Sequence, residues 1–507
     1  MSYMEQKEPP RREERLNASI TYGGTICGLA KKTRGCRLDD AGRSFNQGSI
    51  CLLLPGMAIL NSLPDSVVLL HGAIGCGSCS HSQNANVRSG GNQRFGKVKD
   101  ATWLSTALNE IDVINGGETK LIEAIREADR RYRPAAIIVV AGCVPGIIGD
   151  DIDGVAAKIQ PEVSAKILPV HCEGFKTRIW ATAYDAVYHS IGRNLLEKPL
   201  EQTPLQPDEF LEFKENRRRQ RTVNLMNVSS MGRVDEQELE RLLRSLGLEV
   251  NVFPVFSHPQ EMYRVTQASL SISTCPTHDD YFLKFIEEKF GVPYIIGHMP
   301  IGIENTNRWL RDVADFFELN ETAEKLIDSE TRELLLALEE FKPAFKGKKV
   351  FISAGEFRAL ATAQLMAELG FEIVGVRSFH HDEFAEGEYE KLISISSEDF
   401  VVGIADAQPF EEANLLKRIK PDVFLGHWGG NMTASKLGIT SHVIYNTGLN
   451  YIGYRGVYEL ARRLHRQLRN PAYNSKLSKY VRLPYTSQWY ESDPFKYINA
   501  EGGERAE

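Results

Sequence analysis

Cysteine is the residue type in this sequence that is best suited to metal chemistry. The chain has eight cysteines, and all of them lie within its first 275 residues: Cys27, Cys36, Cys51, Cys76, Cys79, Cys143, Cys172 and Cys275. Thiols in a reducing cytoplasm rarely form disulfides. Two interpretations remain open: buried small hydrophobic side chains, as for most single cysteines, or ligands of a metal or an iron–sulfur cluster.

Three cysteines lie at positions where a sheet could present them to a ligand. Cys76, Cys143 and Cys275 each follow a short apolar run that is typical of a strand (66–70, 136–140 and 270–273). Glycines surround Cys76 in the stretch HGAIGCGSC, which leaves the backbone room to approach a bulky group. In open α/β sheets, ligands bind beyond the carboxyl ends of the strands. These positions are therefore candidates for a shared cluster site.

The elements that must position these residues alternate between strand and helix patterns. Short β-branched runs occur at 66–70, 136–140, 165–170, 222–227, 249–256, 270–273, 349–353, 371–376, 401–404, 422–425 and 442–445. Amphipathic helical patterns lie between many of them, as at 118–131 and 236–246. This alternation predicts an α/β fold with parallel sheets flanked by helices.

The length predicts roughly three domains, at about 150 residues each. Polar and charged stretches divide the chain into three Rossmann-like modules, with an arm at the N-terminus and an extension at the C-terminus. A crevice between modules could hold a metal centre. The boundaries are an N-terminal arm at 1–20, modules at 21–200, 221–340 and 348–468, and a C-terminal extension at 469–507. The extension has few strand patterns, and we expect it to pack on a neighbouring chain.

Composition excludes several classes of protein. The sequence is 42% hydrophobic and 25% charged, as in ordinary globular proteins. Its formal net charge of −7 provides no basic excess for a nucleic acid. We see neither an apolar run long enough to span a membrane nor a signal peptide, and we expect a cytoplasmic protein.

The order and spacing of several segments resemble the alpha-type subunit of nitrogenase component 1 and its relatives. The similarity runs from about residue 50 to about residue 471, and single motifs within it are not specific. The segments that carry it are 65–76 (DSVVLLHGAIGC), 115–125 (NGGETKLIEAI), 143–152 (CVPGIIGDDI), 169–175 (PVHCEGF), Cys275 with 287–293 (EEKFGVP), and 453–456 (GYRG).

The resemblance implies two metal sites. Cys51, Cys76 and Cys143 correspond to the ligands that this subunit gives to an 8Fe–7S P-cluster shared with a beta-type subunit. Cys275 corresponds to the thiolate at one end of a buried, carbide-containing iron–sulfur cofactor of the eight-iron type, without a defined molybdenum or vanadium content. His442 is our candidate for the opposite end, and the resemblance adds Gly429 and Arg358 as cofactor contacts.

The sequence does not decide which residue binds the second end of the cofactor. Alignment through 436–439 places the family's histidine at Tyr445, and a short gap would bring His442 there instead. His427 is a further possibility. The stretch 426–431 lacks the lysine that binds an organic acid in the molybdenum enzyme, so homocitrate or a similar acid is also left open.

The remaining cysteines do not match ligands of the family. We interpret Cys172 as a packed thiol. Cys27 and Cys36 lie in a basic, glycine-rich stretch that could contact a cluster or a partner, and the role of Cys79 is left open.

The expected walls of the cofactor site depart from the nitrogenase pattern. Trp180 and Tyr184 occupy the places of a glutamine and a histidine that deliver protons in nitrogenases. Tyrosine, with an unperturbed pKa near 10, relays protons poorly at neutral pH. His380 and His381 are candidate polar residues of the wall.

These departures favour a nitrogenase-like methylthio-alkane reductase, which cleaves C–S bonds in small organic sulfur compounds. Electrons would come from a separate ATP-dependent iron protein, because the chain has no Walker A motif. We expect a heterotetramer of two alpha-type and two beta-type chains. The alternative is an alpha-type scaffold on which the nitrogenase cofactor is assembled, since scaffolds keep the cofactor cysteine but usually lack the opposite histidine. A true alternative nitrogenase is a third hypothesis.

Overall fold

The structure is a computed structural model that describes residues 6–33, 38, 42–48, 50–81, 91–94, 101–196, 220–227, 232–444 and 448–498, without the side chains of 79–81 and 428. Cys36 and Tyr445 lie outside the described residues, as does the side chain of Cys79. No helix in the described ranges is both long and apolar enough to cross a membrane.

The first sheet is parallel and has the strand order β3-β2-β4-β5. Its strands are β2 (Ser66–His71), β3 (Thr102–Ser105), β4 (Ala136–Ala141) and β5 (Lys166–His171). Every residue of β2 and β4 is buried, as expected for strands that are covered on both faces. One face packs on α7 (Glu118–Tyr132) and α9 (Ile152–Ile159), and the other packs on α3 (Leu53–Leu60) and α10 (Thr182–Asn194).

The second sheet is also parallel, with the order β7-β6-β8-β9. It consists of β6 (Thr222–Asn227), β7 (Glu249–Pro254), β8 (Leu270–Ile272) and β9 (Tyr294–Ile295). The helices of this module are α12 (Arg233–Ser245), α13 (Pro276–Phe290), α14 (Ile303–Phe317) and α15 (Asn320–Leu338). Helix α13 packs on α10 of the first module and on α17 of the third, so it lies at the junction of the modules.

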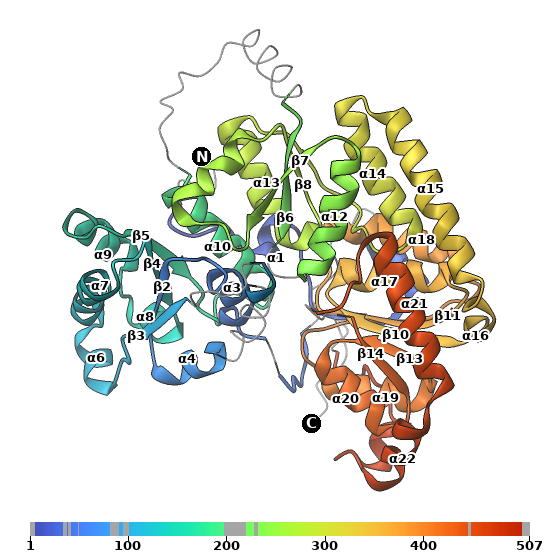
Figure 1. The fold of residues 1–507 in the computed structure, drawn as a ribbon. Helices are drawn as coiled ribbons and strands as arrows, with labels where there is room; N and C mark the ends of the chain where they lie inside the picture. Colours follow the sequence, from blue (N-terminus) through green and yellow to red (C-terminus); the bar gives the residue numbers. More distant parts are fainter. Residues whose placement is uncertain are drawn as a thin grey trace.

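The third sheet has six strands in the order β1-β12-β11-β10-β13-β14. The parallel strands are β10 (Lys349–Ala354), β11 (Glu372–Ser378), β12 (Val401–Ile404), β13 (Val423–Gly426) and β14 (Thr440–Val443). Helices α17 (Glu356–Glu368), α18 (Glu386–Ile395), α19 (Pro409–Ile419), α20 (Trp428–Lys436) and α21 (Gly453–Arg469) cover it. Figure 1 shows the three sheets in separate parts of the molecule, which confirms the predicted parallel α/β fold.

Residues 22–33 do not belong to the first module, contrary to the boundary at residue 21. Strand β1 (Tyr22–Thr25) pairs antiparallel with β12 of the third sheet, with Tyr22 opposite Ile404. Helix α2 (Ile26–Thr33) follows it and packs on α18. The two glycines of β1 allow this pairing, since a Cβ on Gly23 would lie 2.3 Å from the ring of Phe495.

The C-terminal residues pack on their own third module. They form α22 (Ala472–Tyr480) and α23 (Ser487–Glu491). The indole Nε1 of Trp489 donates a hydrogen bond to the carbonyl of Phe410 in α19 at 2.9 Å, and the two rings are 5.2 Å apart. The ring of Tyr497 lies 5.9 Å from that of Trp489 and 5.8 Å from that of Phe410. Residues 487–498 thus pack on the third module of their own chain, and contact of the extension with a neighbouring chain stays a prediction.

Residues 6–20, here called the N-terminal strap, run along all three modules. Arg12, in the short helix α1 (Arg12–Arg15), pairs with Asp185 of α10 and with Asp280 of α13. Further on, Ser19 and His381 exchange two backbone hydrogen bonds of 2.8 Å. The strap thus ties the first module to the second and then to the third.

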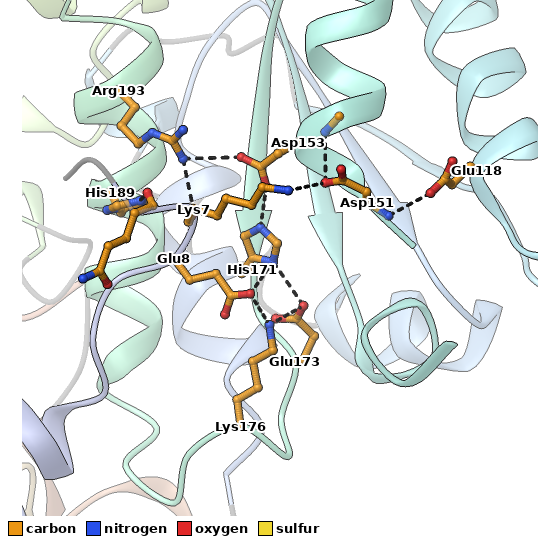
Figure 2. Close-up of polar contacts among 12 residues, drawn as sticks. Lys7, Glu8, Glu118, Asp151, Asp153, His171, Glu173, Lys176, His189 and Arg193 are labelled. Carbon is orange, nitrogen blue, oxygen red and sulfur yellow. Dashed lines mark hydrogen bonds and ion pairs between the residues drawn. The ribbon is translucent and has the colours of Figure 1, made fainter. Parts of the chain in front are cut away.

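The start of the strap is held on the first module by a network of charges (Figure 2). Glu8 accepts from the ammonium of Lys176 at 2.6 Å, and that ammonium also donates to Glu173 at 3.0 Å. His171, at the end of β5, lies between Glu173 and Asp153, at 3.1 and 2.7 Å.

Candidate functional site

Two of the expected cluster ligands follow neighbouring strands of the first sheet. Cys76 lies in α4 (Ile74–His81) directly after β2, and Cys143 is the first residue of α8 (Cys143–Ile148) after β4. The paired strands end side by side, with His71 opposite Ala141. The strand order therefore brings both cysteines to one edge of the sheet, as the carboxyl-end rule predicts.

Gly174, which follows β5 at the same edge, shows how close the sulfurs are. A Cβ on this glycine would lie 3.3 Å from the Sγ of Cys51 and 3.6 Å from the Sγ of Cys143. Cys51 is exposed, and Cys76 and Cys143 are half-buried. Thiols that converge at an accessible backbone glycine have the donor chemistry that an iron–sulfur cluster needs, so the residues present fit such a group.

Large apolar side chains are exposed around these cysteines. Ile74 lies two residues before Cys76, Ile147 lies four residues after Cys143, and Phe175 follows Gly174. Their exposed fractions are 71%, 71% and 54%, respectively. Exposed apolar groups that gather in one region are typical of a protein interface.

Cys275 occupies a different place, at the buried end of β8. It is the N-cap residue of α13 and is only 4% exposed. Its backbone N–H donates to the Oγ of Ser273 at 3.1 Å, and one carboxylate oxygen of Asp279 accepts from the N–H of Thr274 at 3.1 Å and from that of Cys275 at 3.3 Å. These bonds fix the backbone that carries the thiol. Burial, assisted by the charge of Asp279, raises the pKa of the Cys275 thiol to about 12.

Side chains from all three modules gather near Cys275. We call this set the Cys275 cluster, and its members are Trp180, Tyr184, Cys275, His278, Arg358, Phe379, His380 and His427. They come from α10 and the turn before it, from the first turn of α13, from α17, and from the ends of β11 and β13. The cluster therefore lies where the helices α10, α13 and α17 meet.

Ring contacts connect the members of the Cys275 cluster. The rings of Tyr184 and His278 are 4.6 Å apart, and those of Trp180 and Tyr184 are 6.0 Å apart. Trp180 also lies 5.9 Å from Phe379 and 6.4 Å from His380. The result is an edge-to-face wall of aromatic rings from all three modules.

Several buried ring nitrogens of this wall have no hydrogen-bond partner among the described residues. They are Trp180 Nε1, His278 Nδ1 and His380 Nδ1. A buried polar group without a partner costs about 1–3 kcal/mol, so such groups are rare unless a ligand satisfies them. A group with several acceptor atoms, such as the sulfides of an iron–sulfur cluster, would satisfy them next to the Cys275 thiol.

The cationic member of the cluster is Arg358. Its guanidinium donates to the carbonyl of Ile444 at 3.4 Å and lies 5.6 Å from the ring of Tyr451. Burial, followed by the charges of Arg358 and Arg377, lowers the pKa of His427 to about 4. His427 is therefore a neutral imidazole beside a fixed positive charge, which suits an anionic guest.

Comparisons with known proteins agree with this geometry. The model of the family described as nitrogenase component 1 type oxidoreductase matches residues 51–469, most of the chain. The chain belongs to this family. It is 28% identical to the nitrogenase iron-molybdenum cofactor biosynthesis protein NifE of Methanosarcina barkeri, over 87% of this chain and 92% of the relative. It is 26% identical to the nitrogenase molybdenum-iron protein alpha chain of the same organism, over 85% and 86%.

A solved structure shares the fold. The structure titled "Nitrogenase Cp1 at pH 5" superimposes with a TM-score of 0.72 at 22% identity and covers 96% of this chain and 99% of its own. The fold and the family agree with the resemblance seen in the sequence. The proteins named above do not show the finer assignment to methylthio-alkane reductases.

The structure does not bring His442 into the Cys275 cluster. Strand β14 begins at Thr440, so His442 lies inside the strand opposite Leu425 instead of at its end. Burial and the charge of Arg463 lower the pKa of His442 to about 4, and its neighbours Arg463 and Gln467 belong to α21. Gly429 is exposed in α20, with no atom within 4 Å of the place a Cβ would take. Of the two histidines considered for the second end of the site, His427 is the one that lies in the Cys275 cluster, 5.1 Å from the ring of Phe379.

The two neighbouring histidines that were expected in the wall have different surroundings. Both are buried, with exposed fractions of 0% for His380 and 3% for His381. His380 joins the Cys275 cluster through Trp180, whereas His381 bonds to Glu356 at 2.8 Å. Cys172 is buried beside Gly56, as expected for a packed thiol, and Cys27 lies in α2, where its backbone N–H donates to Asp399 at 3.2 Å.

Sequence reasoning missed two members of the cluster, His278 and Phe379. His278 lies three residues after Cys275 at the start of a helix, and residues three apart share a helix face. Phe379 directly follows β11. Both could have been found by applying the helix-face and strand-end rules beyond the cysteines.

Proposed function

We propose that this chain is the alpha-type subunit of a scaffold on which an iron–sulfur cofactor is assembled and then released. The observation that carries the proposal is the set of anchors around Cys275. Within the part of the chain that the structure describes, Cys275 is the only thiol of the Cys275 cluster, and His442 packs against α21 instead. The similarity to NifE proteins, which are described as cofactor biosynthesis proteins, supports the same proposal.

A scaffold needs a site that holds its cargo reversibly. One thiolate gives a single strong bond to iron. The other members, Arg358, His278 and Trp180, offer charge and hydrogen bonds, which are weaker and can exchange with water or with a receiving protein. In this proposal the iron–sulfur cofactor is the substrate of the site. It leaves when a ligand of the acceptor protein takes the place of the Cys275 thiolate on its iron.

The proposal assigns a second, resident cluster to Cys51, Cys76 and Cys143. The accessible sulfurs and the exposed side chains of Ile74 and Phe175 support a site that a beta-type partner completes. Such a cluster would supply electron transfer near the surface, where a separate ATP-dependent iron protein can dock. The proposed assembly is a heterotetramer of two chains of each type.

A second candidate function is reductive cleavage of methylthio-alkanes. The observation in its favour is the aromatic wall of Trp180, Tyr184 and Phe379, because a thioether sulfur gains about 0.3–1.5 kcal/mol beside an aromatic ring. The reaction would convert dimethyl sulfide, two electrons and two protons into methane and methanethiol. Reduction of dinitrogen, the third hypothesis, has less support, because Trp180 and Tyr184 replace the proton-delivering pair of nitrogenases.

One experiment separates these functions. The chain is purified without oxygen together with its partner and divided into two assays. In the first, it is mixed with nitrogenase component 1 that lacks its cofactor, and the gain of acetylene reduction is measured. In the second, the iron protein, ATP and dithionite are added with dimethyl sulfide or dinitrogen, and methane and ammonia are measured.

The scaffold proposal predicts activation of the acceptor and no turnover of either substrate. Cys275→Ala should abolish activation, and Cys172→Ala, which removes another buried thiol, should leave it unchanged. Release of methane with no activation would establish the reductase instead, and ammonia at a comparable rate would establish a nitrogenase. Activation that survives Cys275→Ala would overturn the assignment of the cargo site.

A further inference from the structure

A second group of metal-binding side chains lies behind the aromatic wall, at the carboxyl edge of the third sheet. Glu356 is the first residue of α17 after β10, and His380 and Asp382 follow β11. One donor atom from each of the three lies within 4.8 Å of the others. All three residues have exposed fractions of 0%. We propose that Glu356, His380 and Asp382 bind a divalent first-row transition-metal ion.

The geometry between His380 and Asp382 is that of two ligands of one ion. The Nε2 of His380 and the Oδ2 of Asp382 are 3.5 Å apart. Neither atom has a hydrogen-bond partner among the described residues, although both are buried. Two ligands of one tetrahedral ion, each about 2.0–2.1 Å from it, lie about 3.4 Å apart. The pair is therefore too far apart for a good hydrogen bond and correctly spaced for a shared cation.

The surroundings hold these donors in place. Glu356 accepts hydrogen bonds from His381 at 2.8 Å, from Tyr389 at 3.0 Å and from the backbone N–H of Asp382 at 3.1 Å. The other oxygen of Asp382 accepts from the N–H of Phe384 at 3.1 Å. Metal sites are usually supported by hydrogen bonds of this kind, which orient the ligands before the ion binds.

Charge and donor type select the kind of ion. A divalent ion would supply positive charge beside two buried carboxylates, of which Glu356 also bonds to His381. One imidazole and two carboxylates suit zinc, iron or manganese, whereas a magnesium site rarely includes an imidazole. The proposal does not rest on the proposed function: its donors are the Nε2 of His380 and two carboxylates, whereas the cargo site uses the Cys275 thiol and the Nδ1 of His380.

A comparable group of side chains on the first module already has a cation from the protein, unlike the proposed metal site. Glu8, His171 and Glu173 also have donor atoms close enough to share an ion. Figure 2 shows that the ammonium of Lys176 already lies between the two glutamates, at 2.6 and 3.0 Å, so a cation is supplied by the protein itself. His171 is bonded on both ring nitrogens. This group serves as a matched control.

Zinc is the probe for the experiment. The full chain, with its partner, is purified from cells grown with a zinc salt and is passed through a chelator-containing column, and metals are then counted by mass spectrometry. We expect about one zinc ion per chain in addition to cluster iron. Asp382→Asn should lose the zinc and keep the cluster iron, and His171→Gln should keep both.

A crystal of the wild-type protein locates the ion even if the variants fail to fold. Anomalous difference maps above the zinc and iron edges should show one peak between Glu356, His380 and Asp382. Maps with no peak there would overturn the proposal and leave two buried histidine–carboxylate pairs in its place. Zinc that is retained in full by a folded Asp382→Asn variant would overturn it as well.

Discussion

Arg12 and Asp185 form a buried, two-pronged ion pair between the N-terminal strap and the first module. The Nη2 of Arg12 lies 2.6 Å from one oxygen of Asp185, and its Nε lies 3.1 Å from the other. Both side chains are completely buried. The same Nη2 reaches Asp280 of the second module at 3.2 Å. One arginine from the start of the chain thus neutralises carboxylates of two modules beside the Cys275 cluster.

We predict that Arg12→Met destabilises the protein strongly. The substitution leaves Asp185 and Asp280 in the interior with Arg15 as their remaining cation. Removing one partner of a buried pair costs about 3–5 kcal/mol, and we expect the lower end of this range. The free energy of unfolding in urea is the measurement. Arg11→Met is the control, since Arg11 is exposed and its pair with Glu14 is worth less than about 1 kcal/mol. Equal losses in both variants would contradict the role of Arg12.

The attachment of the strap should weaken at alkaline pH because of His171. Burial opposes protonation of this ring, but hydrogen bonds to Asp153 and Glu173 outweigh burial and raise the pKa of His171 to about 9. A group whose pKa is raised by folding stabilises the protein fully below its unfolded pKa, about 6.5, and loses this effect as the pH rises through about 9.

The expected contribution of His171 is about 3 kcal/mol at pH 6, from a shift of about 2.5 pKa units. The difference in unfolding free energy between the wild type and His171→Gln should therefore be large at pH 6 and should shrink by pH 9.5. Urea denaturation at several pH values measures it. His258→Gln, which removes a partly exposed histidine, is the control. A difference that stays constant with pH would rule out a protonated His171.

Among the described strands, the sequence misses β1, β3 and β9, which all lie at the edge of a sheet, although it predicts the edge strands β5, β7 and β14. Strands β6 and β12 have the predicted bounds, 222–227 and 401–404, because short runs rich in apolar and β-branched residues signal a strand. Strand β1 has the sequence YGGT and no apolar run. It is a strand because the edge of β12 accepts it, and such a long-range pairing leaves no local signal.

The candidate site divides in the same way. Cys76, Cys143 and Cys275 could be placed from the strand-end rule, since each follows a strand that the sequence predicts. His442 could not be placed, because a shift of two residues in the start of β14 moves a side chain from the end of the strand into its middle. Arg358, the member of the Cys275 cluster that comes from α17, is placed there by helix packing between modules. A local sequence pattern does not predict such packing.

Gly174→Ala should remove iron from the site of Cys51 and Cys143 without unfolding the chain. The new Cβ would lie 3.3 and 3.6 Å from the two sulfurs, in the space that the thiolates need to approach a shared cluster. We expect at least half of the iron at this site to be lost, measured by iron analysis and by the spectrum of the reduced protein. Gly75→Ala is the matched control, because a Cβ there meets no atom within 4 Å. Iron content equal to that of the wild type would show that the sulfurs do not converge on a ligand.

The last prediction concerns His278, whose substitution should act in opposite directions on the fold and on the cargo. Its Nδ1 is buried without a partner, and burial keeps the pKa of the ring well below 6.5, so the imidazole is neutral. His278→Phe fills a similar space beside Tyr184 and removes an unsatisfied polar atom. The variant freed of clusters should therefore be more stable than the wild type, by about 1–3 kcal/mol in urea.

The same variant should hold iron at Cys275 less well, because a hydrogen bond to the bound group is lost. Retention of cluster iron during chelator treatment measures this effect, and we expect a several-fold faster loss. His189→Phe is the matched control: both nitrogens of this buried ring are already bonded, to Tyr281 at 2.8 Å and to the carbonyl of Gln6 at 3.0 Å. Its loss should destabilise the fold and leave iron retention at Cys275 unchanged. If His278→Phe behaved like His189→Phe in both measurements, the unpartnered nitrogen of His278 would have a structural role, and the Cys275 cluster would not be the place where the cargo is bound.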